Sequence, residues 1–170
     1  MENSLNQVFS MRKITAIGLL IALGVIAAPF SIPVGVARIY PAQHAINVIA
    51  GALLGPVPAV LAAFLTSTLR NLMGTGTPLA FPGSLFGALL AGLAFRYLKK
   101  DYFAAVGEFV GTAFIGALVA FPLARWLLGF EGLAYFFIVP FALSSLAGAL
   151  LGVLILHLWR KTGGNRLGGF

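Results

Sequence analysis

The chain has 170 residues, of which 60% are apolar and only 9% are charged, and its mean hydropathy of +1.01 excludes an ordinary soluble domain. Because a membrane span needs about 20 mostly apolar residues, this length predicts about six transmembrane helices and no separate soluble domain. The net charge is +7. The chain has no cysteine, which excludes thiolate metal sites, and no basic cluster interleaved with aromatics, which excludes a nucleic-acid partner.

The first predicted span covers residues 14–30 and follows the basic residues Arg12 and Lys13. A basic start before an apolar run is also typical of a signal peptide. This run is longer than a signal h-region, however, and the later segments are membranous too, which favours a retained span. Gly18 and Ala22 lie four residues apart, so they share a helix face that another helix can approach closely. That face either packs inside the bundle or docks a separate membrane subunit.

Residues 31–43 break the apolar pattern with two prolines and a glycine, which predicts an irregular connection. The second span, about 43–55, begins with a polar cluster in which Gln43, His44 and Asn47 fall within about one helical turn. A lone histidine near a helix end is usually a satisfied interfacial residue. Polar groups inside a bilayer usually face a partner or a cavity, so the cluster favours a ligand-binding role.

The third span, about 59–72, ends with Arg70 and Asn71, and the loop 73–82 follows. Two glycines and two prolines interrupt helical geometry in this loop. Backbone that is not helical at membrane depth is tolerated only where it is buried in protein or lines a wet cavity. The alternative is a short external loop with an arginine that reaches the lipid head groups. The loop and the start of the fourth span, about 83–97, add the hydroxyl groups of Thr75, Thr77 and Ser84.

The fifth span, about 102–126, contains Glu108, the carboxylate that the pattern places inside the bilayer. Because Glu108 lies near the inner end of the span, it is expected to pair with Lys99, Lys100 or water. The alternative is that Glu108 couples transport to protons or contacts a ligand.

The sixth span, about 135–159, starts at Tyr135 and is expected to kink at Pro140. The tail, about 161–170, is expected to be disordered. Together the spans predict an all-α fold, in which residues 1–170 form a single integral membrane bundle of six transmembrane helices.

Basic residues at the span ends predict the orientation of the bundle. If the first span leaves the cytoplasm, eight of the eleven Lys and Arg residues lie at inner ends, against Arg38, Arg70 and Arg125 outside. The positive-inside rule therefore places both termini in the cytoplasm, and it supports an even number of spans.

The outer ends of the second and third spans and the loop between the third and fourth spans converge in this arrangement. They predict a small-molecule pocket that is open to the outside and holds no metal or cofactor. The candidate binding residues are His44, Asn47, Arg70, Asn71, Thr75, Thr77, Ser84 and Tyr135. A buried cation would need a carboxylate, and the outer half offers only Glu131, so a neutral polar heterocycle or a weak anion fits better. The chain has no paired carboxylates, no serine elbow and no phosphate-binding loop, so it predicts neither an enzyme nor an ATPase.

Two long runs carry a resemblance to a known family: PAQHAINVIAGALLGP at 41–56 and RNLMGTGTPLAFPGSLFGALLAG at 70–92. Over nearly its whole length the chain resembles the ThiW family of substrate-binding subunits of energy-coupling factor (ECF) vitamin transporters. The resemblance implies capture of hydroxyethylthiazole, the thiazole moiety of thiamine, at a prokaryotic plasma membrane. It also implies a transmembrane coupling protein and two ATPase subunits as partners. The family docks the coupling protein through an Ala-x-x-x-Ala motif in the first helix, and the nearest match here is Gly18 with Ala22.

Other functions stay open at this stage. A transporter that works alone and is coupled to protons through Glu108 would take up its solute without partners, whereas a membrane scaffold would bind no small molecule. Within the ECF interpretation, the ligand is the thiazole, the aminopyrimidine precursor or thiamine, because neutral polar pockets for these differ by a few hydrogen bonds. Arg70 is expected to brace the loop 73–82 through backbone carbonyls.

Overall fold

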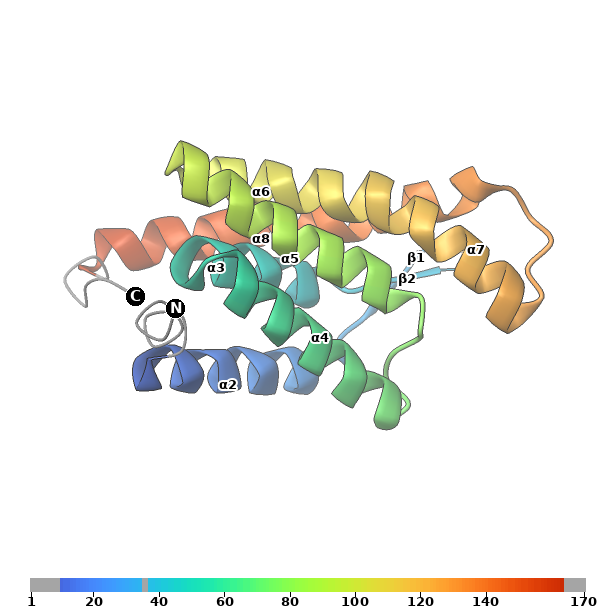
Figure 1. Ribbon diagram of the computed structural model, residues 1–170, viewed down its shortest axis with the longest axis horizontal. Coiled ribbons are helices and arrows are strands. Elements are labelled where there is room, and N and C mark those ends of the chain that lie inside the picture. Colours follow the sequence, from blue (N-terminus) through green and yellow to red (C-terminus); the bar gives the residue numbers. More distant parts are fainter. Residues whose placement is uncertain (1–9, 35–36, 164–170) are drawn as a thin grey trace, which may run out of the picture.

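The computed structural model describes residues 10–34 and 37–163, and they form a helical bundle with one short hairpin (Figure 1). The predicted all-α class is confirmed, and the described residues form six helical rods. Five rods are the single helices α2 (Met11–Ile26), α3 (Pro41–Leu54), α4 (Pro56–Leu72), α5 (Ala80–Leu98) and α8 (Ile138–Lys161). The sixth rod joins α6 (Asp101–Val110), the π-helix η1 (Gly111–Gly116) and α7 (Ala117–Leu128). A 3-10 helix, η2 (Ala134–Phe137), precedes α8.

Three stretches of the described chain are long and apolar enough to cross a membrane: Ala80–Leu98, Asp101–Leu128 and Tyr135–Lys161. The helices α2, α3 and α4 have 16, 14 and 17 residues, which is fewer than the roughly 20 residues of a typical span. The chain is therefore a membrane protein, whereas six crossings and cytoplasmic termini stay predictions.

The first helix is shorter than the predicted span 14–30. It starts after Ser10, whose hydroxyl oxygen accepts a hydrogen bond from the backbone N–H of Lys13 at 3.4 Å. It ends at Ile26, because Pro29 has no backbone N–H and disfavours helical geometry in the residue before it. The expected end at residue 30 was wrong by about one turn.

The connection after α2 is more regular than predicted. Strands β1 (Ile32–Val34) and β2 (Ala37–Ile39) pair antiparallel, with Ile32 opposite Ile39. The backbone N–H of Tyr40 then donates to the Ser144 hydroxyl on α8 at 2.8 Å. This bond ties the start of α3 to α8.

Helix α3 forms the centre of the bundle, because small residues let its neighbours approach its backbone. A Cβ atom on Gly51 would lie 2.7 Å from the backbone nitrogen of Gly92 on α5, and one on Gly152 of α8 would lie 2.9 Å from Cβ of Val48. Ten of the fourteen α3 residues are buried, and they include the polar residues Gln43, His44 and Asn47. Their polar atoms must therefore be satisfied inside the protein or by a ligand.

The predicted kink at Pro140 is wrong. Pro140 is the third residue of α8 and lies in its first turn. Backbone N–H groups of the first turn have no partner within a helix, so the N–H that proline lacks breaks no hydrogen bond there.

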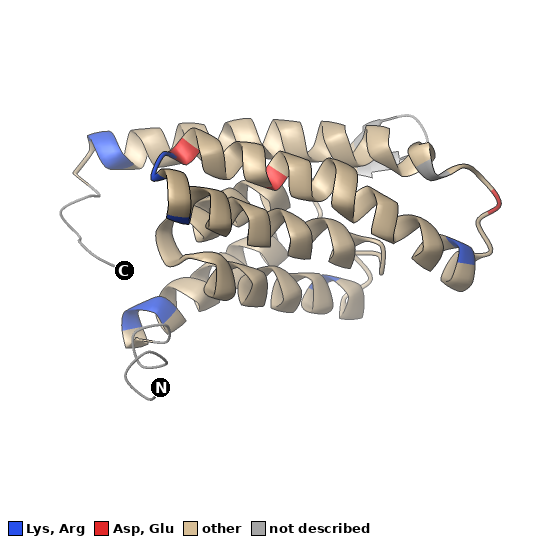
Figure 2. Cartoon of the chain, turned by 45° about the horizontal axis from the view of Figure 1, so that its top comes forward, with Lys and Arg blue, Asp and Glu red and all other residues tan. Residues whose placement is uncertain are grey.

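Most of the basic residues lie at one end of the bundle, where α2 begins and α8 ends (Figure 2). Lys and Arg residues of α2, of the connection from α5 to α6 and of the end of α8 meet there. An even number of crossings would likewise bring those helix ends to one side of a membrane. We call it the basic end.

Candidate functional site

A cavity of about 370 Å³ lies among α3, α4, α5, η2 and α8, away from the basic end. Its polar wall is formed by Gln43, His44, Arg70, Thr77, Ser84 and Ser144. Its aromatic wall is formed by Tyr40, Phe136, Phe137 and Phe141. The volume falls in the range of about 300–1,000 Å³ that is usual for small-molecule sites, and a polar wall facing an aromatic wall suits a small heterocycle.

Four of the eight candidate residues line this cavity: His44, Arg70, Thr77 and Ser84. They come from α3, from the end of α4, from the connection to α5 and from the first turns of α5. The structure therefore brings together the three segments that the sequence analysis expected to converge.

The other four candidates lie elsewhere. Asn47 is 1% exposed and donates from Nδ2 to the backbone carbonyl of Ser84 at 3.3 Å, so it holds α3 to α5 behind the cavity. Asn71 donates to the carbonyl oxygens of Ser67 and Thr77 at 2.8 and 3.2 Å. Its contacts shape the loop.

Thr75 donates from its hydroxyl to the carbonyl oxygen of Arg70 at 3.3 Å, which also places it in the loop rather than on the cavity wall. Tyr135 is 64% exposed, whereas Phe137, two residues later, is 7% exposed. The 3-10 geometry of η2 turns Phe137 inward, so the aromatic wall uses a neighbour of the predicted tyrosine.

Arg70 is a buried cation on the cavity wall, with 2% of its surface exposed. It donates from Nη1 to Gln43 Oε1 at 3.2 Å and from Nη2 to the carbonyl oxygen of Thr75 at 3.3 Å. Its guanidinium carbon lies 4.3 Å from the centre of the Tyr40 ring, which is a cation–π contact. Within the described residues no carboxylate contacts it. The bond to Thr75 is the loop contact that the sequence analysis expected.

His44 is joined to a buried carboxyl group that lies behind the cavity. Its Nδ1 atom is 2.6 Å from Oε1 of Glu108, which is 0% exposed. The Thr112 hydroxyl lies 2.8 Å from the same Oε1 and 2.9 Å from the carbonyl oxygen of Gly83. It has one proton, so it donates to one of these two acceptors.

The predicted pairing of Glu108 with Lys99 or Lys100 is therefore wrong. Glu108 lies two turns inside α6 and faces α3, whereas both lysines precede α6 at the basic end. Because Nδ1 of His44 faces Glu108, the ring nitrogen left for the cavity is Nε2.

Several buried polar atoms near the cavity have no hydrogen-bond partner among the described residues. They include Nε2 of Gln43, Nε of Arg70 and Oε2 of Glu108. Gln43 lines the cavity, and its Oε1 already accepts from Arg70, so its amide nitrogen is a donor in need of an acceptor. The described residues contain no group of three or more His, Asp or Glu side chains that could hold a metal ion.

The sequence analysis missed two features of this site. The aromatic wall from Phe137 and Phe141 carries a signal in the sequence, because aromatics four residues apart share a helix face. The contact of Glu108 with Thr112 carries the same signal, because these residues are also four apart. The contact of His44 with Glu108 carries none, because the sequence does not state that α3 and α6 are neighbours.

An all-helical membrane protein with a small polar and aromatic cavity between its helices has the architecture of a solute-binding membrane protein. Comparison with known families agrees with this class: the ThiW family, described as thiamine-precursor transporter protein, matches residues 14–162. The chain belongs to this family, which is one of transporters. No curated protein and no solved structure matches the chain.

Proposed function

We propose that the chain is the substrate-capture subunit of an ECF-type importer and binds hydroxyethylthiazole from outside the cell membrane. The family supplies the class, a transporter of a thiamine precursor. The observation that supports this ligand is the chemistry of the cavity wall, where hydrogen-bond donors predominate beside a positive charge.

The proton count of the His44–Glu108 pair decides what the cavity presents. With one proton shared between Nδ1 and Oε1, the pair is neutral overall and Nε2 of His44 carries a hydrogen. Without it, the pair is negative and Nε2 is a bare acceptor. A net negative charge at this depth is costly, and the described residues offer Glu108 no cation besides His44. The neutral pair therefore presents an N–H donor to the ligand.

Two further donors face the same space. The amide nitrogen of Gln43 lacks a partner, and the guanidinium of Arg70 lines the cavity. A thiazole ring nitrogen and a hydroxyethyl oxygen are both acceptors, so they match this wall. The aminopyrimidine precursor brings an amino group that needs an acceptor, and cationic thiamine would be repelled by Arg70.

The proposed contact with a coupling protein uses the outer face of α2. Gly18 and Ala22 are exposed, and a Cβ atom on Gly18 would meet nothing within 4 Å. Gly24 faces the other way, because its Cβ atom would lie 2.7 Å from the Thr66 side chain on α4. The chain holds no phosphate-binding loop, so two ATPase subunits would have to drive uptake through that coupling protein.

The buried Glu108 also favours a second candidate, a proton-coupled transporter that works alone. This alternative predicts uptake by the purified protein in proteoliposomes, driven by a pH gradient and lost in Glu108→Gln. The ECF proposal predicts binding but no uptake under those conditions.

Calorimetric titration of the detergent-purified protein tests the ligand directly. We expect one-to-one binding of hydroxyethylthiazole, with much weaker binding of the aminopyrimidine precursor and of thiamine. If none of the three binds, the substrate assignment fails. If thiamine binds most tightly, the argument from Arg70 is wrong.

A further inference from the structure

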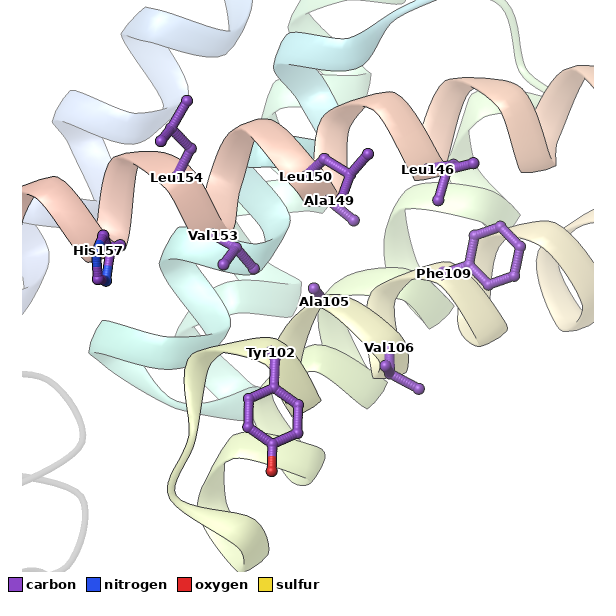
Figure 3. A pocket seen from close by; sticks show the side chains of 10 residues that line it. All are labelled: Tyr102, Ala105, Val106, Phe109, Leu146, Ala149, Leu150, Val153, Leu154 and His157. Atoms are coloured by element: carbon purple, nitrogen blue, oxygen red, sulfur yellow. The ribbon is translucent and has the colours of Figure 1, made fainter.

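A groove of about 510 Å³ runs between α6 and α8 (Figure 3), and it shares no lining residue with the ligand cavity. Its walls are almost entirely carbon, with Val106 and Phe109 on α6 facing Leu146, Leu150 and Val153 on α8. The groove is deep because two of its lining residues are alanines, whose side chains are small. Ala149, which is 3% exposed, and Ala105 stand between these larger side chains, so the two helices leave a channel rather than a flat surface.

The groove opens at one end onto charged groups. Tyr102, Val153 and His157 line the groove and also a second cavity of about 420 Å³. The additional residues of that cavity are Phe95, Lys99, Lys100, Asp101 and Arg160. This mouth lies at the basic end of the bundle (Figure 2).

The mouth is positively charged, because its one carboxylate is already neutralised. Asp101 accepts two hydrogen bonds from the Arg160 guanidinium, each of 2.7 Å. Lys99 and Lys100 are exposed beside this pair, and the Lys100 ammonium lies 5.7 Å from the centre of the Tyr102 ring. A negatively charged group would therefore be attracted to the mouth at the point where the apolar channel begins.

We propose that this groove binds a membrane phospholipid with an anionic head group. One acyl chain lies along α6 from Tyr102 to Phe109, a length of about 10 Å at the rise of an α-helix, and the phosphate lies between Lys99, Lys100 and His157. Charge complementarity selects this occupant, because a basic pocket between membrane helices is the usual site for an anionic head group. A tyrosine at the mouth fits the level of the head groups. The proposal does not depend on the identity of the transported solute.

Native mass spectrometry of the protein, with phosphatidylglycerol and phosphatidylcholine of identical chains, tests the proposal. We expect one phosphatidylglycerol molecule to be retained in preference to phosphatidylcholine. Lys99→Gln with Lys100→Gln should lower that preference by about fivefold for each lysine. Ala105→Phe should fill the channel and remove both lipids. Arg12→Gln with Arg125→Gln removes the same charge from residues that do not line the mouth, and it should change nothing.

Thermal unfolding followed by circular dichroism shows whether each variant is folded. If Ala105→Phe does not fold, the substitution of the two exposed lysines still tests the proposal. Three results would overturn the proposal. They are equal retention of the two lipids by the unchanged protein, unchanged preference in the lysine variant, and the same loss in the control variant. A change of oligomeric state on filling the groove, with lipid retention unchanged, would assign the groove to a second copy of the chain instead.

Discussion

The substitution Glu108→Gln keeps the shape of this side chain but removes its acidic group, so it tests whether ligand binding depends on the acid. In the unchanged protein, the neutral His44–Glu108 pair keeps a hydrogen on Nε2 of His44 and so presents an N–H donor to the ligand. Affinity for an acceptor ligand should therefore depend on the carboxyl group at position 108.

A glutamine at position 108 has nearly the same shape as the acid but no acidic proton to share with His44. Its amide donates to or accepts from Nδ1 of His44, so both tautomers of the neutral ring become accessible and the donor is no longer fixed. Loss of one well-oriented neutral hydrogen bond costs about 1 kcal/mol, which is roughly fivefold in Kd. We expect a drop in affinity of about that size at neutral pH.

Calorimetry with hydroxyethylthiazole at neutral pH measures this drop. Glu131→Gln is the matched control, because it makes the same change at an exposed carboxylate outside the cavity. Circular dichroism shows whether each variant stays folded. Unchanged affinity in Glu108→Gln would refute the idea that this carboxyl group controls the donor.

Three further substitutions test other parts of the structure. Arg70→Ala should weaken ligand binding at least tenfold, because the loop loses its bond to the Thr75 carbonyl and a buried donor disappears; equal affinity by calorimetry would contradict this. Gly51→Leu should lower the free energy of unfolding by several kcal/mol, because its side chain would collide with the α5 backbone; an unchanged urea midpoint would sink that argument. Gly18→Leu with Ala22→Leu should leave binding intact and abolish copurification with the coupling protein, and a reduced ligand affinity would show that this face serves the cavity.

Helix positions followed from local signals in the sequence. Pro56 begins α4, and glycines and prolines mark the connection between α4 and α5, so the expected helices overlap those observed. The end of α2 was misplaced because Ala27 and Ala28 are compatible with a helix, and only the restriction from Pro29 ends it. Local propensity therefore gave the helices to within about a turn.

The site was predictable only where a single segment determines it. Arg70 and Thr77 are seven residues apart in one segment, the end of α4 and the connection to α5, and both line the cavity. His44 and Glu108 are 64 residues apart, and their contact depends on α3 lying beside α6. Hydrophobic pattern does not specify which helices are neighbours when every helix is apolar, so the partner of Glu108 was misassigned.

The packing around Glu108 leaves space for its carboxyl group and for the contact with His44. A Cβ atom on Gly87 of α5 would lie 2.8 Å from Oε1 of Glu108 and would overlap the Thr112 hydroxyl. Glycine at this position thus leaves the room that the carboxyl and hydroxyl groups occupy. Thr112 lies in the π-helix η1, a wider turn of a kind that recurs at functional sites. An apolar residue at position 108 would pack here without desolvating an acid, so the carboxyl group is better explained by control of His44 than by stability of the bundle.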